Sequence, residues 1–234
     1  SGTDAQDLII GDWDGTSGNR KLTLSSLTGY GTLRTDAGAA GTRTLIVDQS
    51  SGDTTFNGML LSHTSGAGAV RSIAFEKKGS SSLTLANVIG KQTVSAGAAD
   101  ADIAVTITAG KLVLAANNIL TGPTTVNGGT LVINGTHPAT APVTVNSGAI
   151  LAGTGSVGIL TNAAGGMVTP GVNGIGTLSV GGSPSLAGTI IAQIDAAGMV
   201  TEGKQWCSLD RTRRSWQRII IEKPFGHDLG SARA

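Results

Sequence analysis

The sequence predicts an all-β fold in which short strands wind into a stack of coils, a β-solenoid. Between Leu8 and Ile194, very short runs skip one position between apolar residues, as in Leu131-x-Ile133, and this period of two is typical of strands with one buried face. Glycine separates almost every pair of runs, and it permits the backbone conformations that tight corners need. Aromatic residues make up only 3% of the chain, so the core must be narrow and built from smaller side chains.

The runs are shorter than the usual strand of about five to six residues and rich in β-branched residues. The expected strands are Asp7–Ile10, Lys21–Leu24, Gly31–Leu33, Thr44–Val47, Thr54–Phe56, Met59–Leu61, Ser72–Phe75, Ser82–Leu85, Gln92–Val94, Asp102–Ile107, Lys111–Leu114 and Thr189–Ile194. A further series lies between Thr124 and Gly182, marked by Val126, Leu131, Ile133, Val143, Val145, Ile150 or Leu151, Val157, Val168, Leu178 and Val180. The turns lack the two-residue placement that reverses a hairpin, which favours a solenoid over a sandwich or barrel.

The charge of the chain gives no sign of a nucleic-acid or membrane partner, and its cysteine content excludes an intrachain disulfide. The formal net charge is +1, which indicates neither a nucleic-acid nor a membrane-surface partner. The single cysteine, Cys207, excludes an intrachain disulfide and receives no role. No apolar run has the length of a membrane helix, so we expect no membrane insertion by this chain.

The stretch from Gly110 to Gly182 contains Gly110-Lys-Leu-Val-Leu, Thr121-Gly-Pro-Thr-Thr-Val-Asn-Gly-Gly-Thr-Leu-Val-Ile-Asn-Gly and Val143-Thr-Val-Asn-Ser-Gly-Ala. With these segments the stretch resembles the passenger-associated repeat of bacterial autotransporters. It extends more weakly over Leu22–Leu85. The resemblance implies a right-handed parallel β-helix on a secreted or surface protein of the bacterial outer membrane. The long amphipathic strands of that family's membrane barrel have no counterpart here.

The composition changes after about Gly198. Residues 1–200 hold nine Lys and Arg against eleven Asp and Glu, whereas residues 201–234 hold seven against four. We therefore expect a repeat domain over 1–198 and an unrelated tail over 199–234, either a junction of two genes or a native, inert segment.

Part of this tail, about residues 216–234, resembles a fragment of glucose-6-phosphate dehydrogenase. The resemblance rests on Glu222-Lys-Pro-Phe-Gly226, preceded by an expected strand (Arg218–Ile221) and followed by an expected helix from about Asp228. By this resemblance Lys223 would face the sugar phosphate and Pro224 would shape the turn. The dinucleotide-binding glycines and the catalytic histidine motif of that family are absent, so we expect Lys223 and Pro224 to be inert and no cofactor to bind.

Four carboxylates offer a catalytic alternative, because β-helices also carry polysaccharide lyases and hydrolases. Asp12 and Asp14 flank Trp13, and Asp100 and Asp102 have the same spacing. Glycosidases need two carboxyl groups about 5–10 Å apart, but both pairs lie in turn-rich sequence, which favours solvated corners. Their oxygen ligands are too few for calcium.

The histidines give no metal site. His63 and His137 have no partner histidine at ligand spacing, and His137, which precedes Pro138, is expected in a surface loop.

These observations predict a structural or adhesive passenger or stalk, extracellular or on the bacterial cell surface, and not an enzyme. The expected partners are carbohydrate or host-surface ligands. The alternative is a carbohydrate-active β-helix, which would bring three or more charged groups together in a cleft.

Overall fold

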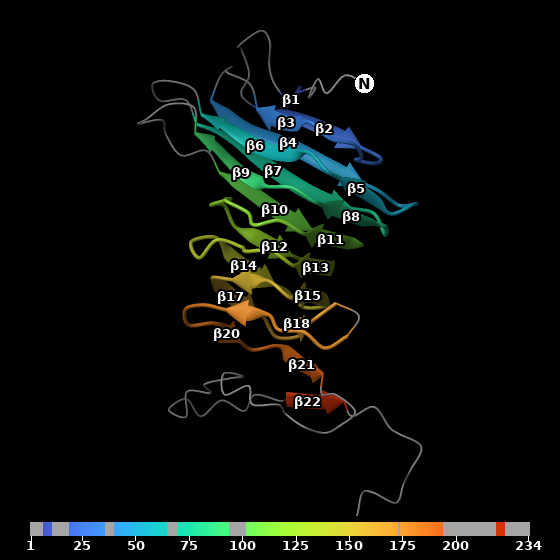
Figure 1. Ribbon diagram of the computed structural model, residues 1–234, viewed down its shortest axis with the longest axis vertical. Coiled ribbons are helices and arrows are strands. Elements are labelled where there is room, and N and C mark those ends of the chain that lie inside the picture. The colour runs from blue at the N-terminus through green and yellow to red at the C-terminus, as the bar shows by residue number, and fades with distance from the viewer. Residues whose placement is uncertain are drawn as a thin grey trace, which may run out of the picture.

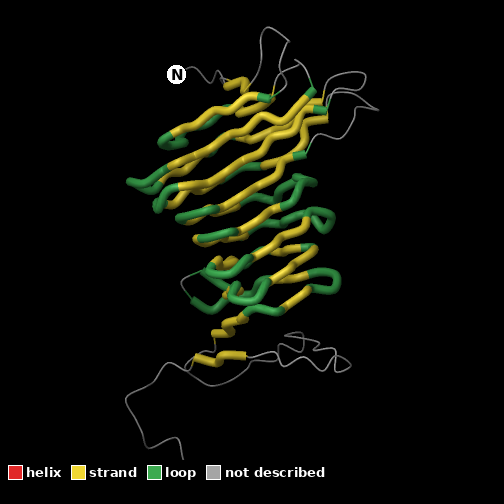
Figure 2. Tube along the Cα trace, turned by 180° about the vertical axis from the view of Figure 1, so that it is seen from behind, coloured by secondary structure: helices red, strands yellow, loops and turns green. Residues whose placement is uncertain are grey.

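The computed structural model describes residues 7–10, 19–35, 40–64, 70–93, 102–172, 174–193 and 219–222. All the regular secondary structure within these ranges is β-strand, as the tube in Figure 2 shows. This confirms the all-β prediction. The strand expected at Arg218–Ile221 is present as Ile219–Glu222, and the helix expected from Asp228 lies outside the described residues.

The strands form parallel sheets that run along the length of the molecule (Figure 1). Sheet 1 contains β1 (Asp7–Ile10), β3 (Thr32–Thr35), β6 (Met59–Thr64) and β9 (Ile89–Thr93). Sheet 2 contains β2 (Arg20–Leu24), β4 (Gly41–Asp48), β7 (Arg71–Lys78), β10 (Ile103–Ile107), β12 (Thr124–Val126), β14 (Pro142–Val145), β17 (Ile159–Asn162) and β20 (Ser185–Leu186). Sheet 3 contains β5 (Thr54–Phe56), β8 (Ser82–Leu85), β11 (Lys111–Leu114), β13 (Gly129–Ile133), β15 (Ala149–Gly153), β18 (Met167–Pro170), β21 (Thr189–Gln193) and β22 (Ile219–Glu222). Sheet 4 contains β16 (Ser156–Val157) and β19 (Ser179–Val180).

The chain visits the sheets in turn, and we call one such passage a coil. Sheets 1 and 4 are the two ends of one face, because single bridges join Gly90 to Ile119 and Thr136 to Ser156, while Asn118 N donates to Thr136 O at 2.8 Å. Long parallel sheets visited in this order are consistent with a β-helix or solenoid.

The coils differ in length along the stack. Ser80 hydrogen-bonds to Ser50, 30 residues earlier, whereas Asn146 hydrogen-bonds to Asn127, only 19 residues earlier. Strands β4 and β7 in the long coils have eight residues each, so the expectation of uniformly short strands was wrong there.

Equivalent apolar residues of successive coils stack into interior columns. One column on sheet 3 consists of Leu83, Leu112, Leu131, Leu151 and Val168. Each of these side chains is at most 4% exposed. Parallel strands are about 4.8 Å apart, so the side chains of one column contact each other directly, and full burial of a leucine stabilises the fold by about 1.5–3 kcal/mol.

A glycine column turns the chain from sheet 2 into sheet 3. Gly79, Gly110 and Gly129 have φ angles of 70°, 68° and 72°, a region that side-chain-bearing residues avoid. A Cβ on Gly110 would lie 2.3 Å from Gly79 O, and one on Gly129 would lie 2.3 Å from Gly110 O. Each corner therefore needs glycine both for its own conformation and to accept the coil beside it.

One strand begins three residues earlier than expected. The sequence pattern predicted Gln92–Val94, whereas β9 is Ile89–Thr93. The apolar pattern did not include Gly90, because glycine has no apolar side chain. Gly90 lies against the next coil, where an added Cβ would be 2.2 Å from Ile119 Cγ1.

We predict that Gly110→Ala lowers the free energy of unfolding by about 2–3 kcal/mol, because left-handed backbone costs a non-glycine residue about 1–2 kcal/mol and the new carbon must also displace a carbonyl. Gly174→Ala is the matched control, since its Cβ would meet nothing within 4 Å, and its effect should stay within about 0.5 kcal/mol. Urea denaturation measures both. Equal effects of the two substitutions would contradict the role of the glycine column.

Candidate functional site

The structure places one of the four candidate carboxylates, because Asp12, Asp14 and Asp100 lie outside the described residues. Asp102 immediately precedes β10. Its carboxylate accepts a hydrogen bond from the Thr121 hydroxyl of the following coil, and its carbonyl accepts one from Ile73 N of the preceding coil at 2.9 Å. Asp102 therefore ties three coils together at a corner.

The described part of the chain contains no group of three or more His, Cys, Asp and Glu side chains that could hold a metal ion. Residues Lys223, Pro224 and Cys207 lie outside the described ranges, and His63 is placed only by its backbone, within β6.

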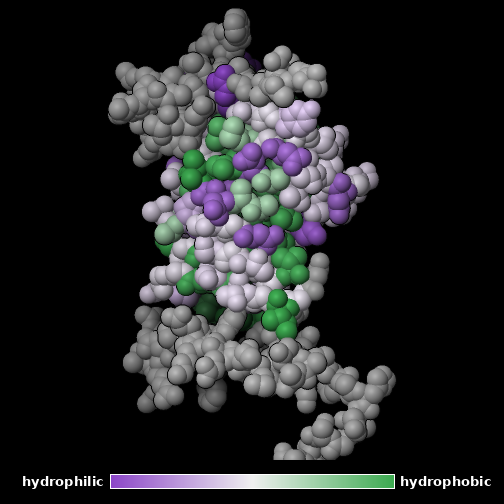
Figure 3. Space-filling view, in the orientation of Figure 1, coloured by the Kyte–Doolittle hydropathy of each residue, from purple (hydrophilic) through white to green (hydrophobic). Residues whose placement is uncertain are grey.

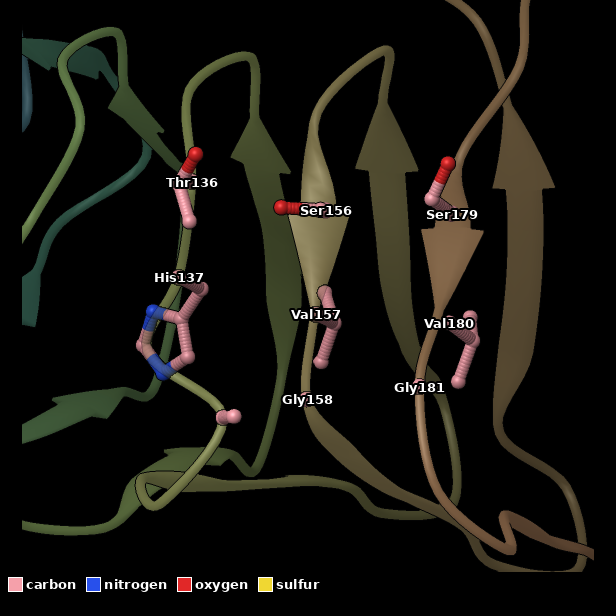
Figure 4. A pocket seen from close by; sticks show the side chains of 9 residues that line it. Thr136, His137, Ser156, Val157, Gly158, Ser179, Val180 and Gly181 are labelled. Carbon is pink, nitrogen blue, oxygen red and sulfur yellow. The ribbon is translucent and has the colours of Figure 1, made fainter.

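A shallow hollow in the described surface lies along sheet 4 and has a volume of about 330 Å³. Successive coils line it with equivalent residues: hydroxyls from Thr136, Ser156 and Ser179, then His137, Val157 and Val180, then Ala139, Gly158 and Gly181. Figure 4 shows these side chains in rows across the strands.

The floor of this hollow requires small residues. A Cβ on Gly158 would lie 2.1 Å from Ala139 Cα, so the neighbouring coils approach too closely for a side chain there. The hollow thus results from tight coil packing, and its lining is mostly apolar, with hydroxyl side chains at one side and no charged side chain.

His137 is buried, and the expectation of a surface loop was wrong. It is 1% exposed, because it follows Thr136 at the position where later coils carry the apolar Val157 and Val180. Its Nε2 lies 3.5 Å from the Thr124 hydroxyl, and its Nδ1 has no hydrogen-bond partner within the described residues. Burial lowers the pKa of His137 to about 4, so the ring is neutral near pH 7 and acts as an interior packing residue.

A second surface feature is a row of hydroxyls on the outer side of sheet 2, which we call the threonine rank. Register aligns Thr106, Thr125, Thr144, Thr161 and Ser185 in five consecutive coils. The four threonines are half-buried, which leaves part of each side chain available to solvent. In the preceding coil the same position holds Glu76, which pairs with Lys78 at 3.2 Å.

Charged residues make up only 13% of the chain. The face drawn in Figure 3 is mostly of intermediate hydropathy, with scattered hydrophilic and hydrophobic residues. An uncharged array of hydroxyl and methyl groups can hydrogen-bond as donor and acceptor while offering small apolar contacts. Sequence reasoning missed this rank because it depends on register between coils, which single strands do not reveal.

Two family models match the chain. Residues 109–133 match the Passenger-associated-transport-repeat. Residues 176–234 match Glucose-6-phosphate dehydrogenase, NAD binding domain. Both resemblances expected from the sequence are thereby confirmed. No curated protein and no solved structure matches the chain.

The two matches occupy different parts of the fold. The repeat match contains β11, β12 and β13, which is one full 19-residue coil step on sheet 3. The dehydrogenase match begins earlier than the expected 216 and includes β19, β20 and β21 of the last coils together with β22. Among the described residues no helix is long and apolar enough to cross a membrane.

We predict that stability falls below pH 7 because of His137. The unfolded chain binds more protons than the folded one between the folded-state pKa of about 4 and the unfolded value of about 6.5. Above pH 7 the titration of His137 does not change the free energy of unfolding. As the pH falls through that window the free energy of unfolding decreases, by about 3 kcal/mol at pH 4.

The measurement compares the free energy of unfolding of the natural chain and of His137→Leu at pH 7 and pH 4. The difference between the two proteins should shift by about 3 kcal/mol in favour of the variant at the lower pH. Parallel pH curves for the two proteins would show that the ring is accessible to protons in the folded state.

Proposed function

We propose that this chain is part of the passenger of a bacterial autotransporter, a right-handed parallel β-helix that serves as a structural or adhesive stalk and not as an enzyme. The observation that carries the proposal is the match of residues 109–133 to the passenger repeat, located in coils whose pairing continues in register on both sides. Right-handedness is supported by the strong preference of parallel crossover connections for that hand.

The mechanism proposed is geometric. Each coil buries its own interior residues against its neighbours, so stability accumulates along the stack and the stalk stays rigid without disulfides. Secretion in an extended form and folding outside the cell suit such a chain, because nearest-neighbour coils supply its contacts. We accordingly place the protein outside the cell or on the bacterial surface.

Recognition would use the outer faces. The threonine rank presents a row of hydroxyl groups without charge. Uncharged, repetitive polar surfaces suit neutral polymers, so carbohydrate on host or neighbouring cells is the partner we propose. The carbohydrate-active alternative is less favoured, because the one described candidate carboxylate, Asp102, is engaged with Thr121 at a corner.

The dehydrogenase-like segment supports no enzymatic function in this proposal. Its matched residues include strands β19 to β21, which stack on the preceding coils. We place the boundary between the repeat domain and the tail at residues 198/199.

Localisation tests the proposal directly. Protease added to intact cells of the source bacterium should remove the protein while a cytoplasmic marker survives, because a surface stalk is accessible from outside. Protection of the protein until the cells are lysed would contradict the surface assignment.

Carbohydrate binding gives a second prediction. On a panel of immobilised neutral and acidic polysaccharides, binding should fall at least tenfold for the triple variant Thr106→Val, Thr125→Val, Thr144→Val, which keeps the shape and removes the hydroxyls. Thr84→Val on the outer side of sheet 3 is the matched control. Cleavage of a polysaccharide that is lost on changing Asp12 or Asp14 would instead favour the enzymatic alternative.

A further inference from the structure

The coil stack does not end with its last repeat strand on sheet 3. Strand β22 pairs with β21 in parallel, and register joins Ile190 to Ile219, Ile191 to Ile220, Ala192 to Ile221 and Gln193 to Glu222. Figure 1 shows β22 beyond β21 at the end of the molecule. The terminal strand of this sheet therefore comes from the dehydrogenase-like segment.

At the end of the stack, sheet 3 has the edge strand most able to pair with another chain. The other terminal strands, β19 and β20, have two residues each, whereas β21 has five. A long edge strand leaves a row of backbone donors and acceptors open to pairing with other chains, while very short edge strands avoid this. Among the described terminal strands, β21 is thus the one that most needs a partner.

The register of β22 fits this need. By backbone register, Ile219 follows Ile190, which itself follows Leu151 and Val168 on sheet 3. Ile190 and Ile219 are 29 positions apart, the same separation as that joining Asp53 to Ser82 across a long coil. The linking segment therefore has a length that the stack uses elsewhere.

The composition of β22 also suits a parallel edge. Three consecutive β-branched isoleucines, Ile219 to Ile221, form a run that is apolar at every position. Strands of parallel sheets covered on both faces have such continuous apolar runs. This pattern differs from that of the alternating strands of the coils, and it is compatible with parallel pairing to β21.

We propose that Ile219–Glu222 is a cap strand that occupies the open edge of β21, and that this edge is a docking site for a parallel β-strand. The occupant is the segment of this chain itself, which would give the tail a structural role whatever its origin. Residues 219–222 close the hydrogen-bonding row of β21 and thereby keep the stack from pairing with a second copy.

The test is amide hydrogen exchange of β21 in the full-length chain and in two variants. Ile219→Asp combined with Ile221→Asp changes two alternate positions, the first of which pairs with Ile190. The matched control Ile220→Thr changes the position between them. In the double variant, exchange at residues 189–193 should speed up at least about a hundredfold, or a dimer should appear in sedimentation. The control should keep slow exchange and remain a monomer.

Slow exchange in β21 together with a monomeric double variant would overturn the proposal, as would equal effects of the double variant and the control. Protection at residues 111–133 reports whether the stack itself remains folded.

A cross-linking measurement avoids any disruption of the strand. In a Cys207→Ser background, Ile191→Cys and Ile220→Cys should form an intramolecular disulfide under mild oxidation, because paired parallel positions lie within disulfide reach. Failure of this pair to cross-link, while Thr125→Cys with Thr144→Cys does so, would overturn the proposal.

Discussion

The structure depends on one constraint: each coil must repeat the backbone path of the coil beside it, so that parallel strands pair in register. Sheet 2 keeps this register from β2 to β20 and sheet 3 from β5 to β22. Because the side-chain period of a strand is two, a slip of one residue would move a whole interior set to the surface. Corners such as Gly110, where a carbonyl of the adjacent coil lies 2.3 Å from where a Cβ would be, fix the register as firmly as the apolar columns do.

Two polar residues in the interior of sheet 2 are held by backbone carbonyls. Lys77 stands between Val47 and Ile107 in one column of sheet 2 and is fully buried. Its ammonium donates to the carbonyls of Lys78 and Gly79 at the corner. Burial lowers the pKa of Lys77, and the nearby Asp48 and Asp53 oppose that shift. Asn162 of the same column reaches the next coil through Thr189 O at 3.2 Å. Such residues sit at strand ends because mid-strand carbonyls are already used by the sheets.

The sequence was sufficient for the strand content and for most of the interior, since alternation correctly marked Leu131, Ile133 and Val143 as buried. It also left Ile150 and Leu151 undecided, and register shows that Leu151 belongs to the interior column. The sequence could not predict the burial of residues whose environment depends on the neighbouring coils. Val180 follows the buried pattern yet is 37% exposed, because few coils follow it. His137 looked like a loop residue and is interior, and the threonine rank exists only once five coils are aligned.

Disulfide trapping tests the in-register stack most directly. In a Cys207→Ser background, Thr125→Cys with Thr144→Cys places two thiols on adjacent coils, within the Cα separation that a disulfide accepts. Thr125→Cys with Thr161→Cys places them two coils apart, at about 10 Å, which is beyond that reach. We expect rapid intramolecular cross-linking of the first pair and none of the second. Cross-linking of the second pair, or of neither, would contradict the stack.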